Sequence, residues 1–328
     1  MFAKLLVPLD RSPLAEQALG RAVALARRCD APLDLVLVHE PYPNVVADAQ
    51  IRRERELDID QAYIEQLAGD LTMESKIPVT CAVLRGSPPE MICERAAQVG
   101  ADLIVMTTHG RTGLSRAWLG SVADAIMRRS SIPVLMLHPT PAAEEKNPAS
   151  EPFKRILIPF DGSAMAADML PVAADLARAT GADLTLLRVV APVPILMPID
   201  PTMPSVFGPT IPDQEATTNL VGEVKAELAE IARRLQEQTG LTVSTHVSVS
   251  ERTADAIVEF AARHGMDVIA MSSQGRGASR LLLGSVADKV LRSSDLPVLL
   301  RRSTRSGRSP ELIVEQSVAE QLPALTTR

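Results

Sequence analysis

An internal repeat constrains the fold of this chain more than any other feature of its sequence. Three segments recur in the same order: Leu5–Asp10 (LLVPLD) with Ile156–Asp161 (ILIPFD), Ala101–Met106 (ADLIVM) with Met266–Met271 (MDVIAM), and Leu119–Asp124 with Leu283–Asp288 (both LGSVAD). With 328 residues, the chain has room for roughly two domains of ordinary size. A repeat that spans most of such a chain indicates a duplication. We therefore predict two copies of one fold in tandem.

Each copy alternates short β-branched runs with amphipathic helical patterns, which is typical of βαβ units and of a parallel sheet with helices on both faces. The predicted fold class is α/β, with two tandem Rossmann-like domains, each a five-stranded parallel sheet of order 3-2-1-4-5. In that order a ligand crevice is expected beyond the ends of the first and fourth strands. The predicted strands are residues 3–9, 33–39, 78–84, 102–107 and 133–138 in the first copy and 155–160, 183–190, 242–249, 267–272 and 297–301 in the second; the predicted helices of the first copy are residues 13–29, 54–75, 88–99 and 119–130.

A proline-rich, charged segment without hydrophobic periodicity separates the two copies. Such a composition is typical of a solvated linker. We predict domain 1 at residues 1–139, a linker at 140–152, domain 2 at 153–302 and a C-terminal tail at 303–328. The tail is polar, and the Ser-Pro-Glu sequence that begins at Ser309 predicts one short helix within it.

Composition argues against several classes of function. The formal net charge is −6 and 2% of the residues are aromatic, whereas nucleic-acid-binding proteins usually present a basic surface with stacking side chains. No apolar run reaches the roughly 18 residues of a membrane-spanning helix, and the N-terminus lacks a secretory signal pattern. We therefore expect a cytoplasmic protein that binds neither nucleic acid nor membrane. The cysteines, Cys29, Cys81 and Cys93, lack Cys-x-x-Cys spacing, so we expect buried, reduced thiols.

The segment after the fourth predicted strand of domain 1 is the main candidate for a ligand site. Residues 107–113 read TTHGRTG, and the chain then reaches Gly120 and Ser121 at a predicted helix start. Glycines let the backbone approach phosphate oxygens, and free amides at a helix N-terminus carry partial positive charge. This pattern predicts a phosphate cradle. The alternative is that the glycines serve a tight turn and that Ser121 and Asp124 form a capping box for their own helix.

Three motifs in each half resemble the universal stress protein family. They are Val-Pro-x-Asp at the first strand, the apolar strand that ends in Met106 ahead of His109-Gly110-Arg111, and Leu-Gly-Ser-Val-Ala-Asp followed by Pro-Val-Leu. The resemblance covers nearly the whole chain. It implies an adenine nucleotide alpha hydrolase-like fold and a stress-response regulator that binds ATP, with or without Mg²⁺, and turns it over little or not at all. It implies neither a catalytic residue nor a metal site.

The resemblance also implies roles for single residues. Asp10 would hold the adenosine end of the nucleotide at the tip of the first strand, and residues 38–40 would line the base. The alternative for Asp10 is a turn residue ahead of the helix start at Ser12 and Pro13. The implied nucleotide-binding residues are Pro8, Asp10, Glu40, Met106, Thr107, Gly110, Arg111, Gly120, Ser121 and Val122 in domain 1, and Pro159, Asp161, Val189, Met271, Ser272, Gly275, Arg276, Gly284, Ser285 and Val286 in domain 2.

Both halves depart from the family's pattern of Gly-x-x-Gly, nine residues, then Gly-Ser or Gly-Thr. Domain 1 has Thr107 in place of the first glycine but keeps the nine-residue spacing, whereas domain 2 has Ser272 there and only eight residues before Gly284. Among the residues that would line the base, Glu40 stands where an apolar residue is expected, and domain 2 has Val189 at that place. Domain 1 is thus the better candidate, while the apolar wall of domain 2 partly offsets its altered loop.

The insertion at residues 192–215 of domain 2 holds seven prolines together with apolar residues. Because proline cannot donate to a β-ladder and apolar residues disfavour plain solvation, we expect a loop without strands that folds over another part of the protein. The first interpretation is that this loop covers the hydrophobic core of its domain. A lid on the nucleotide site of the same domain and a partner surface are the alternatives.

Three functions stay open from the sequence. The first is a nucleotide-binding regulator, and the second is a nucleotide-free interaction module in which both sites have decayed, with an unknown protein partner. The third is a slow ATP hydrolase or phosphotransferase, for which the chain offers no Walker A lysine loop. In the universal stress protein family the fifth strands commonly pair across a two-fold axis. We therefore expect residues 134–136 to pair with residues 298–300 within the chain, and a homodimer of whole chains is a further expectation.

Overall fold

Helices and strands alternate as expected in the first copy of the repeat, and in the second copy the alternation is interrupted by two consecutive helices and by three consecutive strands. The computed structural model describes residues 1–40, 48–108, 119–139, 152–198, 207–273 and 283–302. Domain 1 contains β1 (Leu5–Leu9), α1 (Pro13–Cys29), β2 (Leu33–His39), α2 (Asp48–Ser75), β3 (Val79–Arg85), α3 (Pro88–Val99), β4 (Leu103–Thr107), α4 (Ser121–Arg129) and β5 (Val134–Leu137). Domain 2 contains β6 (Arg155–Pro159), α5 (Ala164–Ala167), α6 (Met169–Thr180), β7 (Asp183–Val190), β8 (Pro194–Pro198), β9 (Phe207–Pro212), α7 (Gln214–Thr239), β10 (Val243–Val249), α8 (Thr253–Arg263), β11 (Val268–Ser272), α9 (Ser285–Ser293) and β12 (Val298–Arg301).

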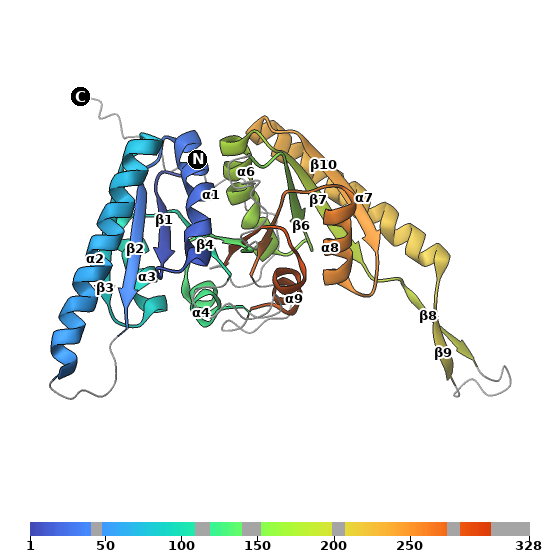
Figure 1. The fold of residues 1–328 in the computed structure, drawn as a ribbon. Coiled ribbons are helices and arrows are strands. Elements are labelled where there is room, and N and C mark those ends of the chain that lie inside the picture. The colour runs from blue at the N-terminus through green and yellow to red at the C-terminus, as the bar shows by residue number, and fades with distance from the viewer. Residues whose placement is uncertain (41–47, 109–118, 140–151, 199–206, 274–282, 303–328) are drawn as a thin grey trace, which may run out of the picture.

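Of the described strands, all but β8 and β9 belong to one continuous ten-stranded sheet (Figure 1). Its order is β10-β7-β6-β11-β12-β5-β4-β1-β2-β3. Neighbouring strands within each half are parallel, so the predicted order 3-2-1-4-5 occurs twice. The α/β fold class is confirmed, with the difference that the two sheets are fused edge to edge. The strand order reverses between β1 and β4 in one half and between β6 and β11 in the other.

The antiparallel pairing of β5 and β12 joins the two halves. Leu135 lies opposite Leu299 at the centre of the pairing. The flanking pairs are Met136 with Val298 and Val134 with Leu300. This is the predicted pairing, and it is confirmed. Because an unpaired apolar strand at a sheet edge invites association, one seam covers the apolar edges of both halves.

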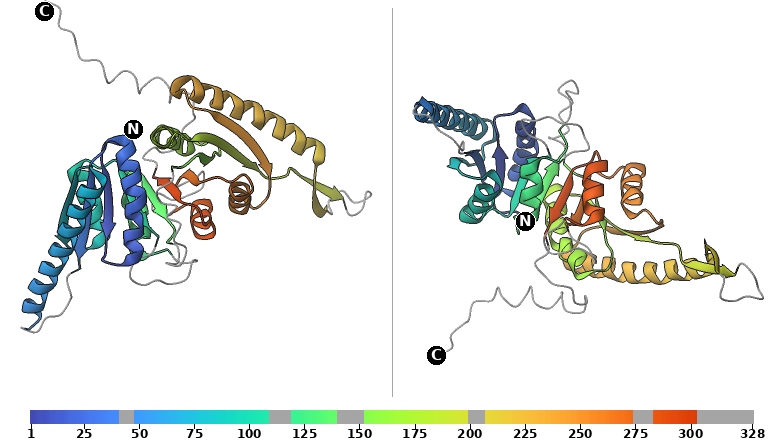
Figure 2. Two further views of the ribbon diagram at one scale, coloured as in Figure 1. Left: turned by 45° about the horizontal axis from the view of Figure 1, so that its top comes forward. Right: turned by 90° about the horizontal axis from the view of Figure 1, so that it is seen from below.

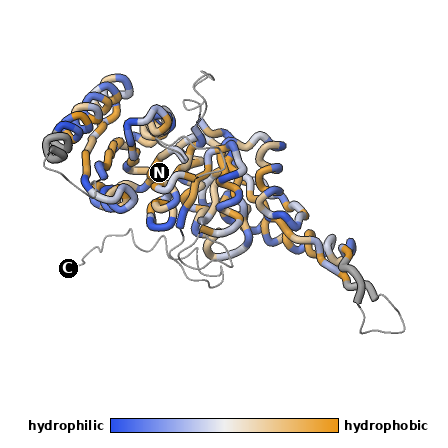
Figure 3. The backbone as a smooth tube through the Cα atoms, turned by 60° about the horizontal axis from the view of Figure 1, so that its bottom comes forward, coloured by the Kyte–Doolittle hydropathy of each residue, from blue (hydrophilic) through white to orange (hydrophobic). Residues whose placement is uncertain are grey.

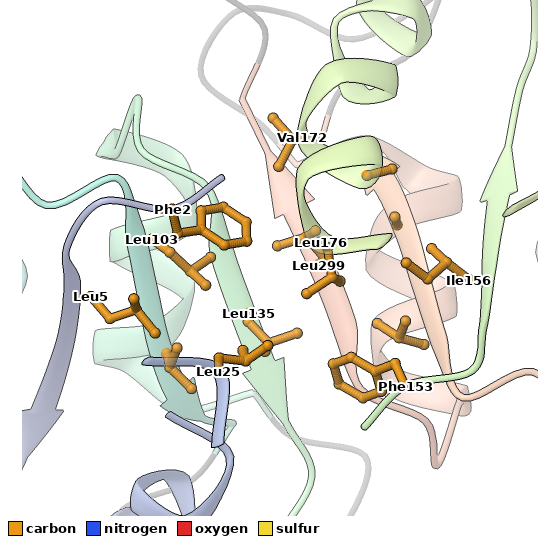
Figure 4. Close-up of a cluster of buried hydrophobic side chains, with 14 of the residues drawn as sticks. Phe2, Leu5, Leu25, Leu103, Leu135, Phe153, Ile156, Val172, Leu176 and Leu299 are labelled. Atoms are coloured by element: carbon orange, nitrogen blue, oxygen red, sulfur yellow. The ribbon is translucent and has the colours of Figure 1, made fainter. Parts of the chain in front are cut away.

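Each face of the sheet has a hydrophobic core that runs through both halves. One core lies under α1, α2, α6 and α7, and the other lies under α3, α4, α8 and α9. Figure 4 shows part of the first core at the seam, with Leu135 and Leu299 among apolar residues of both halves. The guanidinium of Arg21 on α1 lies 4.2 Å from the ring centre of Phe153 in domain 2, which is a cation–π contact between the halves. In Figure 3, apolar residues follow the central strands.

Local sequence explains where the first helix of each half begins. Ser12 precedes α1, and its hydroxyl accepts a hydrogen bond from the N–H of Ala15 at 3.1 Å. Ser163 precedes α5 and accepts from the N–H of Ala166 at the same distance. Both serines are N-cap residues, which satisfy an N–H group that has no partner within the helix.

The insertion in domain 2 forms a hairpin, so the expectations of a loop without strands and of coverage of the core were wrong. Strands β8 and β9 pair antiparallel, with Ile195 opposite Ile211. Figures 1 and 2 show this hairpin extending away from the sheet and the helices. Pro194, Ile195, Ile211 and Pro212 are exposed. Prolines fit such a hairpin because each strand of an isolated pair has one free edge, where a residue without an N–H group loses no hydrogen bond.

The three cysteines are free thiols, and each is half-buried rather than fully buried as expected. Burial is the largest cause that raises the pKa of Cys29, Cys81 and Cys93 above the ordinary value of a thiol. A thiol with a raised pKa is protonated at neutral pH and is a poor nucleophile. These residues are therefore suited to packing and not to thiol chemistry.

Candidate nucleotide-binding site

The strand ends of domain 1 bring the start of α4 to the edge of the sheet. β1 and β4 are parallel neighbours, so the chain leaves both strands at the same edge. Beyond β4, the N–H of Gly120 donates to the carbonyl of Thr108 at 2.8 Å, and the N–H of Thr108 donates to the carbonyl of Leu137 at 2.9 Å. These hydrogen bonds fix Gly120, the residue that precedes α4, next to the ends of β4 and β5. The convergence of Gly120 with the tip of the first strand stays a prediction.

Among the residues that the structure describes, no side chain caps the start of α4. Its N-cap residue is Gly120, so no N-cap side chain accepts from the N–H groups of the first turn, which have no partner within the helix. Ser121 is the first helical residue rather than the N-cap, and the carboxylate of Asp124 accepts two hydrogen bonds from Arg128, at 2.9 and 3.0 Å. The capping box of Ser121 and Asp124 is therefore not formed. The tight turn at Gly110 and Gly113 lies outside the described residues, so the phosphate cradle at this helix start stays a prediction.

Domain 2 repeats this arrangement. The N–H of Gly284 donates to the carbonyl of Ser273 at 2.7 Å, and the N–H of Ser273 donates to the carbonyl of Arg301 at 2.9 Å. Gly284 is the N-cap of α9, again without a capping side chain, and Asp288 pairs with Arg292 at 2.9 Å. The shorter loop of domain 2 thus leaves its helix start in the same local geometry as that of domain 1.

The aspartates at the first strand ends take part in turns. Oδ1 of Asp10 accepts from the N–H of Ser12 at 3.0 Å, and Oδ1 of Asp161 accepts from the N–H and hydroxyl of Ser163 at 2.9 and 2.6 Å. Such side-chain turns hold the backbone ahead of a helix start. The structure therefore shows the turn role that the sequence left as an alternative for Asp10. That role also fixes each aspartate at the edge where the candidate site lies.

The end of β2 in domain 1 takes part in a polar network that sequence reasoning missed. Nδ1 of His39 lies 3.2 Å from Oδ2 of Asp60 on α2, and Nε of Arg11 lies 3.2 Å from Oδ1 of the same carboxylate. The side chain of His39 therefore faces α2, on the opposite face of the sheet from Val38, which packs in the core under α3 and α4. His39 does not line a base together with Val38, and Glu40 is exposed.

The repeat itself carried a signal for this network. At the positions equivalent to those of Arg11, His39 and Asp60, domain 2 has Gly162, Val190 and Val224. The strand registers therefore align Val189 with Val38, and the comparison of Val189 with Glu40 was wrong. Arg11 has a φ of 63°, and Gly162 has a φ of 77°. A non-glycine residue with such a φ is uncommon and points to a constraint from its surroundings, which the ion pair with Asp60 supplies. A comparison of the halves position by position reveals these polar replacements in domain 1.

The predicted site residues differ in how exposed they are. Pro8, Met106, Thr107 and Met271 are buried, whereas Asp10, Gly120, Val122, Pro159, Asp161, Val189, Ser272, Gly284 and Val286 are half-buried and Glu40, Ser121 and Ser285 are exposed. Gly110, Arg111, Gly275 and Arg276 lie outside the described residues. Chemically, the described part offers N–H donors at two helix starts and polar side chains at two strand tips.

Two further observations bear on the classes of site that this chain can hold. Within the ranges given above, no helix is both long and apolar enough to cross a membrane. In the same part of the chain, no three histidine, cysteine or acidic side chains are grouped so that they could hold a metal ion. The cradle-like helix starts are therefore the site candidates that the described residues support best.

Together these features define a duplicated, doubly wound α/β protein with an open helix start at the topological switch point of each half. A model of the universal stress protein family matches residues 1–138 and, separately, residues 152–302. The chain therefore belongs to the universal stress protein family and carries two copies of its domain in tandem.

Relatives in the same family are similar over most of the chain. The chain is 28% identical over 309 residues to a universal stress protein of Mycolicibacterium smegmatis, an alignment that covers 91% of this chain and 96% of the relative. It is 26% identical over 265 residues to one of Mycobacterium tuberculosis, with 80% and 82% covered. Among solved structures, a universal stress protein from Archaeoglobus fulgidus gives a TM-score of 0.68 at 18% identity, with 91% and 98% covered. That likeness shows the fold.

Proposed function

We propose that this protein is an adenine-nucleotide-binding regulator of the stress response, and that ATP binds at the strand ends of each half, with or without Mg²⁺. The phosphates would meet the N–H groups at the start of α4 in domain 1 and of α9 in domain 2. The adenosine would extend toward the tips of β1 and β6, where Asp10 and Asp161 lie. The residues named from the sequence for the two sites are the residues of this proposal, including those outside the described ranges.

One contrast carries the proposal. In domain 1, α1 begins with the capping serine Ser12, whereas α4 begins with Gly120 and no capping side chain. In domain 2, Ser163 caps α5, whereas α9 begins with Gly284. In each half, the helix after the first strand is therefore capped, whereas the helix after the strand beside the switch point begins at a glycine. α3, α6 and α8 also lack a capping side chain, but α4 and α9 are the helices that follow β4 and β11. The partial positive charge of an open helix start at that place suits a phosphate group.

Bound ATP would supply negative charge to these helix starts, and the protein residues would hold and orient it. We expect a binding function with little turnover, exerted in the cytoplasm, in which occupancy biases assembly with a second copy or another protein. Domain 1 is the better candidate because its loop keeps the nine-residue spacing. We also propose that residues 1–139 and 153–302 are the two domains, joined by a linker at 140–152.

Calorimetric titration of ATP into the purified protein tests this proposal. Gly120→Val and Gly284→Val place a bulky side chain at one open helix start each, and Gly222→Val is the matched control because an added Cβ at Gly222 meets no atom within 4 Å. We expect each site variant to weaken one ATP site by about tenfold or more, which corresponds to about 1.4 kcal/mol, and the control to leave both sites unchanged.

Two other outcomes would replace the proposal. Wild-type protein that retains no nucleotide after purification, and that shows no heat with ATP, would be an interaction module whose sites have decayed. Metal-dependent release of phosphate that Gly120→Val abolishes would instead indicate a slow ATP hydrolase.

A further inference from the structure

We propose that Arg302, which belongs to domain 2, is a positioning residue for the nucleotide site of domain 1. Nη1 of Arg302 donates to the carbonyl oxygen of Arg128 at 2.7 Å. Arg128 is the penultimate residue of α4, the helix whose first turn forms the proposed phosphate cradle. The inference rests on the proposed function for its ligand, but the contact itself does not depend on nucleotide.

The contact stabilises the end of the helix opposite to the ligand. The last carbonyl groups of a helix have no partner within it and carry partial negative charge. The guanidinium of Arg302 satisfies the carbonyl of Arg128 and places a positive charge beside it. Arg302 is half-buried, so water screens this interaction less than it would screen a fully exposed pair.

The short length of α4 makes its two ends interdependent. α4 has nine residues, and isolated helices of this length are marginal in water. An anion at the first turn and a cation at the last turn therefore stabilise the same ordered state. Any loss of order at the Arg302 end must lower the affinity of the open helix start for phosphate, because binding then has to order the helix first.

A chain of hydrogen bonds connects Arg302 to the site of its own domain. The N–H of Gly284, at the start of α9, donates to Ser273, and the N–H of Ser273 donates to the carbonyl of Arg301. Arg301 in turn donates from Nη1 to the carbonyl of Asp168, at the start of α6, at 3.0 Å. The strand end that carries Arg302 is thus hydrogen-bonded to Ser273, which in turn is bonded to Gly284 of the proposed domain 2 site.

The charges of α4 and α9 lie near one another across the seam. Figure 1 shows the two helices side by side. The pKa of Arg128 is raised, first by its hydrogen bonds to Asp124 and also by the charge of Asp288 on α9. The residue that follows β5 at the place of Arg302 is His138, so the two halves differ in the side chain that they place there. Domain 2 thus provides a guanidinium, that of Arg302, to domain 1. Domain 1 has no guanidinium at the equivalent position to provide to domain 2.

Hydrogen exchange of the α4 amides tests the contact in the full-length protein without nucleotide. Arg302→Gln removes the charge, Arg302→Lys keeps it, and Arg252→Gln is the matched control because Arg252 is an exposed domain 2 arginine with 80% of its side chain accessible. We expect Arg302→Gln to speed exchange across α4 by about threefold to tenfold, as for the loss of a charge at a helix end. Arg302→Lys should restore most of the protection, and Arg252→Gln should change nothing.

ATP titration of the same variants tests the positioning role. In a Gly284→Val background, which leaves the site of domain 1, Arg302→Gln should weaken ATP binding by about threefold to tenfold. In a Gly120→Val background, which leaves the site of domain 2, the effect should be less than about twofold. If Arg302 had a merely structural role, Arg302→Gln would lower the ATP affinity of both sites equally, and that result would overturn the inference. Unchanged hydrogen exchange of the α4 amides in Arg302→Gln would overturn it as well. If the wild-type protein bound no ATP, the proposed function would fail, while the exchange experiment would still decide whether Arg302 stabilises α4.

Discussion

Leu135 of β5 and Leu299 of β12 lie directly opposite each other at equivalent positions of the two repeats, and neither side chain is accessible to solvent (both 0%). A pair of equivalent residues can face each other only where the two halves are related by an approximate two-fold axis. The seam between the halves therefore has the geometry of an isologous interface within one chain. It also makes each of the two hydrophobic cores continuous from one half to the other.

Truncation at the seam should destabilise the protein as a whole. We expect Leu135→Ala to lower the free energy of unfolding by about 2–5 kcal/mol, because it leaves a cavity in a core that cannot collapse freely. Urea denaturation followed by circular dichroism measures this. Since Leu135 and Leu299 are in contact, the double variant should cost less than the sum of the two single variants. Strictly additive losses would contradict a shared seam.

A buried ion pair in domain 1 should be sensitive to the loss of one partner. Asp34 is fully buried, and its carboxylate accepts from Nε and Nη2 of Arg95, both at 2.9 Å, and from the hydroxyl of Thr80 at 2.6 Å. Asp34→Ala leaves the Arg95 charge without this partner, so we expect a loss of about 3–5 kcal/mol in the free energy of unfolding. Chemical denaturation provides the measurement.

Domain 2 supplies the control for this ion pair. At the places of Asp34 and Thr80 it has Thr185 and Ser244, whose hydroxyl oxygens lie 3.0 Å apart, and a phenylalanine takes the place of Arg95. The double variant Asp34→Thr with Arg95→Phe should therefore regain most of the stability lost in Asp34→Ala, because no unpaired charge remains. A double variant less stable than Asp34→Ala would show that the charges themselves are required.

The hairpin of β8 and β9 should be dispensable for stability. Its stem residues with described side chains are exposed, including Ile195 at 42% and Ile211 at 43%. Replacement of residues 194–212 by a short Gly-Ser linker should shift Tm by no more than about 2 °C, since surface changes away from the core are worth about 0.5 kcal/mol. Differential scanning calorimetry measures this. A large loss of Tm would mean that the hairpin packs on the domain.

His246 should make stability depend on pH. Its ring centre lies 4.7 Å from that of Phe260 and 5.7 Å from that of His264. Partial burial lowers the pKa of His246, and the charges of His264 and Lys225 add to this. The folded state therefore binds fewer protons than the unfolded state as the pH falls below about 6.5. The stability that the neutral ring contributes is present above that pH and is lost as the pH falls through the lowered pKa.

Urea titrations of the wild type and of His246→Gln at several pH values between about 5 and 8 test this dependence. The wild type should lose more of its free energy of unfolding than the variant as the pH falls. A loss that is the same in both proteins, or larger in the variant, would contradict the assignment.

Periodic segments were predicted well. Among contacts between distant segments, the pairing of β5 with β12 was predicted from the family resemblance, but the hairpin and the polar network of domain 1 were not. The predicted helix 13–29 and strand 183–190 coincide with α1 and β7, because strong hydrophobic patterns and the cap at Ser12 define them locally. The hairpin was missed because proline argues against a central strand, whereas each strand of an isolated pair is an edge strand. In the candidate site, the helix starts without a capping side chain follow from Gly120 and Gly284, because a glycine N-cap has no side chain that could accept a hydrogen bond. The network of Arg11, His39 and Asp60 depends on how α2 packs against the end of β2, and local spacing does not encode that packing.

The most direct test of the account follows backbone amide resonances during a titration with ATP. If phosphate binds at the open helix starts, the largest shifts should occur at residues 121–123 and 285–287, and the amides at the start of α1, which Ser12 caps, should move little. Shifts of this pattern that saturate would support the central claim. An absence of shifts at both open helix starts up to about 1 mM ATP, a concentration matched to a weak ligand, would contradict it.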